Sequence, residues 1–297
     1  MQPLRPRGAP AGASLVRYTA LALLFSVLWS AAFIAVKVAL RDAPPLFLMA
    51  ARFLVAGGTL LIYAAGRGRL PRRAAEWGTI ALLGVLNYAV YLGLTAVALR
   101  DLSAGMAAVL ASTNPLMLAL AAPLLLNERL RASQIAGLLI SFGGVTAVMW
   151  SRIGDQNQLG AMALVLVAIA ALVAGTIVFK RTALTHDLLV VNAGQLLVAG
   201  VVLAVPSVLW EPLGTVRFTG SFAAAQAFLI VGVSWIGMSI WFWLLSQGDA
   251  TRASAYFFLN PVLGLFLAAL LLDEPLRLGD FAGSAAVAVG IYMVQRA

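Results

Sequence analysis

The sequence Leu-Leu-Leu-Asn-Glu-Arg-Leu-Arg at residues 124–131 returns as Leu-Leu-Leu-Asp-Glu-Pro-Leu-Arg at residues 270–277. The two stretches are 146 residues apart (270 minus 124), and the same offset aligns other informative residues. The aligned pairs are Asn114-Pro115 with Asn260-Pro261, Gly137 with Gly283, and Gly144 with Gly290. Matched Asn-Pro, Glu, Arg and Gly residues in one register indicate that the chain is a duplicated half.

Hydrophobic residues make up 62% of the 297 residues and charged residues 10%, too few polar groups for a water-soluble surface. A run of about 20 apolar residues crosses a bilayer, and it must be helical because no water bonds its backbone there. The sequence therefore predicts an all-α integral membrane protein with ten transmembrane helices. They are expected near residues 18–40, 46–65, 77–99, 103–126, 133–150, 159–179, 188–209, 222–246, 251–272 and 279–295.

The basic residues predict the orientation, because Lys and Arg accumulate in short cytoplasmic loops. Most of them fall inside when the N-terminus is cytoplasmic, and the C-terminus is then cytoplasmic too. Residues 1–14, rich in Pro, Gly and Arg, are expected to form a disordered cytoplasmic lead. The net charge of +9 reflects this bias and attraction to the lipid bilayer, so no nucleic-acid partner is expected. We expect a multi-pass protein of the plasma membrane, the inner membrane in a bacterium.

Ten spans in two equivalent halves give five helices to each half, and an odd number forces the second half to enter the membrane upside down. We therefore expect two inverted five-helix repeats, residues 15–152 and 153–297. Glu128 and Glu274 then lie on opposite sides of the membrane. Inverted repeats around a site at mid-membrane are typical of secondary transporters.

A set of motifs spread over nearly the whole chain points to one family. These are Trp29 with Lys37, residues 52–54, 96–99 and 103–105, Pro115, residues 125–130, Gly137 with Gly144, and in the second copy Pro261, Glu274 and Gly283. In these motifs the chain resembles EamA-type members of the drug/metabolite transporter superfamily. Asn127 and Asp273 depart from the family pattern, in which a Gly commonly precedes the Glu.

This resemblance implies a carrier with a central cavity walled by spans 1–4 and 6–9, with spans 5 and 10 at the periphery. It also implies export, and it makes Trp29 a candidate substrate-binding residue. Gly137 and Gly144 share one helix face, as do Gly283 and Gly290, and another backbone can approach such a face closely. The glycine faces therefore serve either packing within one subunit or a homodimer seam.

Proline inside a membrane helix kinks the axis and frees a carbonyl group, and a neighbouring Asn can bond the opened backbone or a ligand. Pro115 and Pro261 lie midway along their spans, so we favour hinges beside the cavity over incidental kinks. Polar and aromatic residues next to these hinges join the candidate substrate-binding set. They are Ser112, Asn114, Tyr256, Phe257 and Asn260.

Lys37 and Arg52 fall inside predicted spans, where an unpaired charge costs at least ~2.5–3.5 kcal/mol. Lys37 either snorkels toward the interface near Arg41 or binds substrate. Arg52 lies deeper, where a cavity or a contact with backbone carbonyls and helix ends is favoured. A positive pathway of this kind favours solutes that carry a carboxylate over organic cations.

Amides, hydroxyls and aromatic rings on spans 3, 6, 7 and 8 complete the candidate site. Such residues either contact an aromatic or amphipathic solute or pack against other helices. The set comprises Asn87, Tyr88, Tyr91, Thr176, Gln195, Trp235 and Ser239. Trp241 and Trp243 point to different faces of span 8, so at most one of them faces a cavity.

The sequence offers little other chemistry. Every Asp and Glu lies in a loop or at a span end, and the single His, His186, is in a loop, so no proton relay is visible at mid-membrane. There is no nucleotide-binding motif, Cys or His cluster. We therefore expect no catalytic residue, no metal site and no cofactor, and we do not expect the protein to be an enzyme. A channel would need a continuous polar stripe, which the scattered amides do not supply.

The sequence thus predicts a secondary transporter whose partner is a small-molecule substrate. We expect export of amino acids, aromatic ones included, by alternating access around a central cavity. Import or exchange of sugars, nucleotide-linked metabolites or other small solutes is the alternative within the superfamily. Uniport, exchange and proton antiport are all compatible with the sequence.

Overall fold

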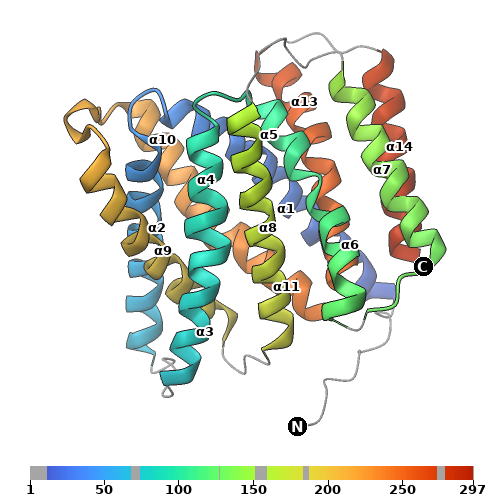
Figure 1. Cartoon of the computed structure of the whole chain (residues 1–297), viewed down its shortest axis with the longest axis horizontal. Coiled ribbons are helices and arrows are strands. Elements are labelled where there is room, and N and C mark those ends of the chain that lie inside the picture. Colours follow the sequence, from blue (N-terminus) through green and yellow to red (C-terminus); the bar gives the residue numbers. More distant parts are fainter. Residues whose placement is uncertain are drawn as a thin grey trace.

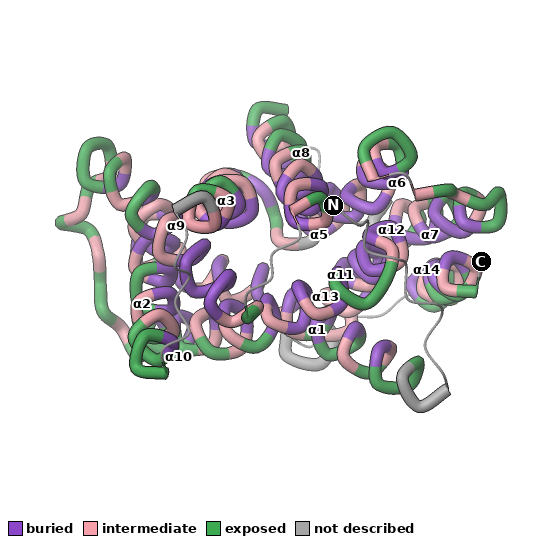
Figure 2. The backbone as a smooth tube through the Cα atoms, turned by 90° about the horizontal axis from the view of Figure 1, so that it is seen from below, coloured by how far each residue is buried: buried purple, intermediate pink, exposed green. Residues whose placement is uncertain are grey.

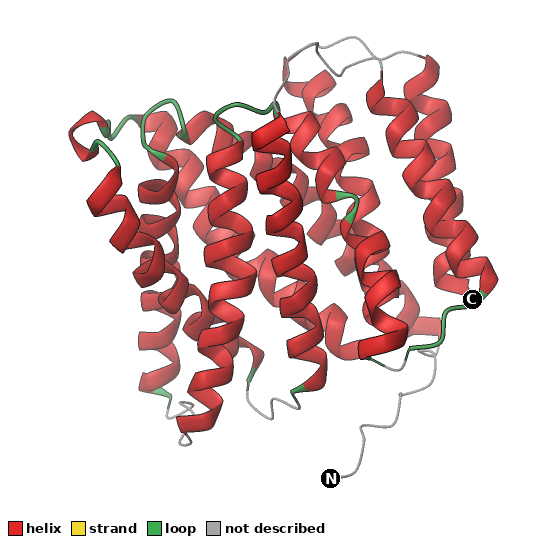
Figure 3. Cartoon of the chain, viewed as in Figure 1, coloured by secondary structure: helices red, strands yellow, loops and turns green. Residues whose placement is uncertain are grey.

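The computed structural model describes residues 12–67, 74–126, 128–150, 159–182, 187–272 and 278–296. Within these ranges the regular structure is helical, without strands (Figure 3). Eight of the helices are long and apolar enough to cross a membrane. The predicted all-α membrane fold is therefore confirmed.

The predicted first copy, residues 15–152, is described up to residue 150, apart from residues 68–73 and 127. It comprises α1 (Gly12–Ala39), α2 (Pro45–Gly66), α3 (Ala74–Gly84) continued by η1 (Val85–Val90) and α4 (Tyr91–Ala98), α5 (Ala104–Ala111), α6 (Asn114–Leu125) and α7 (Ala132–Trp150). The second copy comprises α8 (Leu159–Arg181), α9 (Leu188–Trp210), η2 (Leu213–Thr215), α10 (Gly220–Ala227) continued by η3 (Phe228–Gly237) and α11 (Met238–Gln247), α12 (Ala250–Ser254), η4 (Ala255–Phe258), α13 (Leu259–Leu272) and α14 (Leu278–Arg296).

The ten predicted spans all fall on helices, but two of them are not among the eight that are long and apolar enough to cross a membrane. In the place of span 5 the apolar helix covers Ala132–Ala147, and predicted span 251–272 is divided among α12, η4 and α13. Ten complete crossings stay a prediction. Of the predicted lead, residues 1–11 lie outside the described residues, whereas residues 12–14 are helical and open α1. Residues 273–277, with Glu274, also lie outside them.

Successive spans run in alternate directions between two sides of the molecule (Figure 1). We call one the Asp42 side, formed by loops 40–44, 99–103 and 211–219, and the other the Glu128 side, formed by loops 128–131 and 248–249. Buried residues gather toward the middle of the bundle and exposed ones on its outside (Figure 2). Many exposed residues on the helices are large and apolar, such as Leu120 and Leu124, as expected for a surface that faces lipid.

Helices α2 and α9 occupy equivalent places in the two copies and pack against each other. A Cβ on Gly57 would lie 2.5 Å from the backbone N of Leu197, and one on Gly200 would lie 2.8 Å from the backbone N of Leu54. Leu54 and Gly57 align with Leu197 and Gly200, so the contact is reciprocal. It is also antiparallel, which means that the second copy is inverted with respect to the first.

Helices α7 and α14, the last helix of each copy, form a second antiparallel pair. Cβ atoms on Gly137 and Gly144 would lie 2.6 Å and 2.7 Å from the carbonyl oxygens of Gly290 and Gly283. Between these crossings Ser141 Oγ donates to the carbonyl of Val287 at 3.3 Å. Of the two uses that the sequence allowed for the glycine faces, the structure has packing within one subunit.

Among the inner spans, too, helices of one copy pack against helices of the other. Helix α1 packs against η3 of span 8, and α8 packs against η1 and α4 of span 3. Spans 3 and 8 both contain a π-helical segment, η1 and η3, and such segments are frequent at functional sites. Spans 4 and 9 are both broken in the middle, so four of the inner spans carry irregular backbone that could not be read from the hydrophobic pattern.

Candidate functional site

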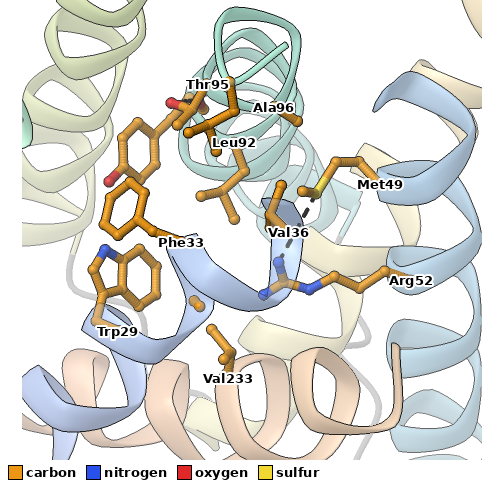
Figure 4. Close-up of a pocket in the computed structure, with 12 residues that line it drawn as sticks. Trp29, Phe33, Val36, Met49, Arg52, Leu92, Thr95, Ala96 and Val233 are labelled. Atoms are coloured by element: carbon orange, nitrogen blue, oxygen red, sulfur yellow. Dashed lines mark hydrogen bonds between the residues drawn. The ribbon is translucent and has the colours of Figure 1, made fainter. Parts of the chain in front are cut away.

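A pocket opens between α1, α2, α4 and η3, lined near the Asp42 side by the last turns of α1 and α4 and the start of α2 (Figure 4). The cavity has a volume of about 30 Å³, within an empty space of about 370 Å³ when the open mouth is included. The pocket is therefore narrow, and a solute the size of an amino acid requires the surrounding helices to move apart. The lining residues are Trp29, Ala32, Phe33, Val36, Met49, Arg52, Tyr91, Leu92, Thr95, Ala96, Leu99 and Val233.

Arg52 is the charged residue of this lining and is only 1% exposed. Its Nε donates to Ser234 Oγ at 2.9 Å, and its guanidinium carbon lies 5.2 Å from the centre of the Phe53 ring. Nη1 lies 3.9 Å from Met49 Sδ, and Nη2 has no hydrogen-bond partner among the described residues. None of the described carboxylates pairs with it. Figure 4 shows the guanidinium pointing from α2 toward Val36 of α1.

A chain of buried, uncharged groups holds Ser234 in place. Tyr88 Oη donates to Asn192 Oδ1, and Asn192 Nδ2 donates to the carbonyl of Ser234 at 2.8 Å. The Tyr88 ring meets the Phe53 ring edge-on, with centroids 5.4 Å apart. This network joins η1, α9 and η3 and fixes the hydroxyl that binds Arg52, without supplying a negative charge.

Aromatic side chains form one wall of the pocket and extend from it along α1. The Trp29 ring lies parallel to that of Tyr91, with centroids 6.3 Å apart, and contacts Phe25 at 5.2 Å and Phe257 at 6.1 Å. Trp241 contacts both Phe25 and Phe257. The structure thus brings together three predicted residues, Trp29, Tyr91 and Phe257, and adds two others.

The amides of spans 3 and 7 form a second buried cluster, on the α8 side of η1. Asn87 Nδ2 donates to Gln195 Oε1 at 3.0 Å, while Asn87 Oδ1 and Gln195 Nε2 have no partner among the described residues. A Cβ on Gly175 of α8 would overlap the Asn87 side chain, and the neighbouring Thr176 is buried. None of these residues lines the pocket, so the predicted amides are close to the site without forming its surface.

The Asn-Pro pairs lie at the breaks of spans 4 and 9. Helix α6 begins at Asn114 after a break at Ser112, and α13 begins one residue before Asn260. Because α5 packs against α13, and α6 against α12 and η4, the two breaks lie opposite each other. Asn114 and Asn260 are at most 1% exposed, and their side-chain amides have no hydrogen-bond partner among the described residues. Pro115 and Pro261 therefore stand at points of irregular backbone, as hinges would.

The remaining predicted residues lie away from the pocket. Trp235 Nε1 donates to a carbonyl of α2 at 3.1 Å, and Ser239 Oγ donates back to the carbonyl of Trp235 at 2.5 Å. Tyr256 contacts Tyr18, with ring centroids 6.2 Å apart. Lys37 is half-buried in the last turn of α1 and is not among the residues that line the pocket.

Charged side chains join the helix ends on the Glu128 side. The Glu128 carboxylate accepts from the backbone N of Ala250 at 2.9 Å and caps α12. Lys180 donates to the carbonyl of Leu245 at 3.1 Å, near the end of α11, and Arg181 donates to the last carbonyl of α6 at 2.7 Å. These bonds tie spans 4, 6, 8 and 9 together on this side of the molecule.

Sequence reasoning missed several residues of the site. Phe33 lies one turn after Trp29, and Met49 lies three residues before Arg52, so helical spacing could have found both. Ser234 aligns with Tyr88 at the offset of 146, but its role depends on the π-helical segment η3, which leaves no recognisable sequence signal.

Comparison with known proteins bears on this arrangement. The model of the EamA-like transporter family matches residues 17–150 and 159–296. A Bacillus subtilis protein described as the uncharacterized transporter YvbV is 27% identical over 93% of this chain and 91% of its own. An Escherichia coli protein described as a probable amino-acid metabolite efflux pump is 27% identical over 92% of this chain and 93% of its own. One solved crystal structure shares the fold, with a TM-score of 0.79 and 21% identity over 94% of this chain and 98% of that chain.

Proposed function

Since the chain belongs to the EamA-like transporter family, it is a multi-pass membrane transporter, and we propose that it exports amino acids, aromatic ones included, by alternating access. The likeness to a probable amino-acid metabolite efflux pump supports the substrate class and the direction. The distribution of Lys and Arg supports a plasma-membrane protein, the inner membrane in a bacterium, with both termini in the cytoplasm.

One observation carries the choice of substrate: Nη2 of Arg52 finds no hydrogen-bond partner among the described residues, and it lies in a pocket whose opposite wall is aromatic. A carboxylate is the natural partner of such a group, because charge-assisted bonds to Arg are short and strong. The rings of Trp29, Phe33 and Tyr91 then provide a surface for an aromatic or large apolar side chain. An amino acid combines both features in one small molecule.

Alternating access requires one side of the site to be closed while the other opens. In the proposed cycle the Glu128 side is the closed one, which is supported by the bonds of Glu128, Lys180 and Arg181 there and by the pocket toward the Asp42 side. The breaks before Pro115 and Pro261 supply points at which spans 4 and 9 can bend. Bending or rocking there would widen the pocket and then expose the site to the other side.

Transport by proteoliposomes tests the proposal. Vesicles containing the purified protein are given radiolabelled phenylalanine, leucine, a hexose, a nucleotide sugar or an organic dication, with and without a pH gradient. We expect the two amino acids to move and Arg52→Gln to slow them by about tenfold or more, whereas the exposed Arg100→Gln is unchanged. Movement of the hexose, nucleotide sugar or dication at the rate of the amino acids would overturn the substrate assignment.

A further inference from the structure

We infer that this protein is an exchanger. After it releases one solute, its binding site turns back to the first side with a second carboxylate-bearing solute bound, because Arg52 needs a carboxylate beside it in the closed state. The inference rests on the proposed function and determines how transport is coupled.

The guanidinium of Arg52 is sealed from solvent among uncharged groups. It is 1% exposed, and its partners are a serine hydroxyl, a methionine sulfur and a phenyl ring, from Ser234, Met49 and Phe53. A buried charge without a compensating charge is strongly unfavourable, and an arginine does not relieve this by losing its proton. The site therefore holds the positive charge of Arg52, and none of the described residues supplies the negative charge that would neutralise it.

The neighbouring network does not supply that counter-charge. Tyr88 is bonded to Asn192, which is bonded in turn to the backbone of Ser234, so these groups are neutral and already engaged. They hold Ser234 and hence the Nε side of the guanidinium, while no group in the described part of the chain bonds to Nη2. The remaining lining of the pocket is aliphatic or aromatic apart from Thr95.

This arrangement makes the loaded and the empty carrier unequal. When the pocket is open, water can surround the guanidinium. When the helices close without a ligand, Arg52 must give up that water with little in return, whereas closure around a carboxylate neutralises the charge. The loaded carrier therefore passes through the closed state much faster than the empty one, and net release without a returning solute is slow.

Efflux from loaded vesicles tests this directly. Release of radiolabelled phenylalanine is measured into plain buffer, into unlabelled phenylalanine and into phenethylamine, which lacks the carboxylate. We expect phenylalanine outside to accelerate release by about tenfold or more and phenethylamine to have no effect. Release that is equally fast into plain buffer would overturn the inference while leaving amino-acid transport intact.

Charge variants separate the role of Arg52 from general damage. Arg52→Gln keeps a donor for Ser234 but removes the charge, so the ratio of exchange to one-way release should fall to about one. Arg52→Lys and Ser234→Ala keep the charge and should keep a high ratio, even where their absolute rates are lower. A ratio in Arg52→Gln equal to that of the unaltered protein would also overturn the inference.

A labelling experiment without substrate tests the role of Arg52 even if the Arg52→Gln variant is inactive in transport or no amino acid is transported. The chain has no Cys, so Ala32→Cys introduces a single thiol into the pocket lining. A membrane-impermeant thiol reagent is applied from each side in oriented vesicles. With Arg52 present, reagent on one side should label the molecules that face it at once and the rest at least about tenfold more slowly, at the rate at which the empty site reorients; Arg52→Gln should accelerate this second phase. An equally fast second phase in both proteins would contradict the inference.

Discussion

Gly57 lies so close to Leu197 that a Cβ on the glycine would come within 2.5 Å of the leucine backbone nitrogen. Since the obstructing atoms belong to the backbone, Gly57→Ala must push α2 and α9 apart. We expect a loss of about 1–3 kcal/mol of stability, seen as a lower melting temperature in detergent. Gly58→Ala, with open space around its Cβ position, is the matched control. Equal melting of the two variants would contradict the packing described for α2 and α9.

Glu128→Gln should weaken the closed Glu128 side. The carboxylate caps the N-terminus of α12, where a negative charge interacts favourably with free backbone N–H groups, and we expect a loss of about 0.5–2 kcal/mol. Thermal unfolding in detergent measures it, with the exposed Asp101→Asn as control. In addition, a thiol placed at Ala32 should become more reactive from the Glu128 side. Unchanged melting and reactivity would show that this contact does not hold the side closed.

Trp29→Ala should change selectivity more than overall activity. Trp29 stacks on Tyr91 and borders the pocket, so its removal takes away aromatic surface from the substrate site. We expect the KM for phenylalanine to rise about tenfold and that for alanine to rise much less, with Trp29→Phe between the two. Transport assays with both amino acids measure this. A parallel loss for both would indicate a structural role for the indole ring.

Single cysteines can test the inverted arrangement. Arg131 and Thr215 are exposed on the Glu128 side and the Asp42 side, respectively. Arg131→Cys should be labelled by an impermeant reagent only from the cytoplasm, and Thr215→Cys only from outside. Labelling of both from one face would refute the topology and with it the alternating-access proposal.

The hydrophobic pattern was sufficient for the all-α membrane fold, because bilayer thickness fixes helix length, and the matched Gly and Asn-Pro residues were sufficient for the duplication. The same pattern could not show that spans 3 and 8 become π-helical, since Val85–Val90 and Phe228–Gly237 are as apolar as the turns around them. Those segments determine where Tyr88 and Ser234 lie, so the network around Arg52 could not be predicted from the sequence.

Individual site residues were harder to assign because an apolar or aromatic residue packs equally well against a helix or a solute. Arg52 could be singled out, since a charge in a membrane span requires a reason. Trp29 and Tyr91 do line the pocket, whereas Trp235, with the same kind of side chain, bonds to the backbone of α2. The difference depends on the rotation of each helix, which only the packed structure defines.

The pairs α2–α9 and α7–α14 stand at opposite ends of the bundle, and each joins one helix from either copy (Figure 1). Because backbone atoms meet in both, neither pair can slide far without losing its fit. The two copies therefore cannot swing past each other as separate rigid bodies. Under the proposed alternating access, bending of the six spans between the two pairs would preserve both contacts, whereas a swing of the two copies as rigid bodies would break them.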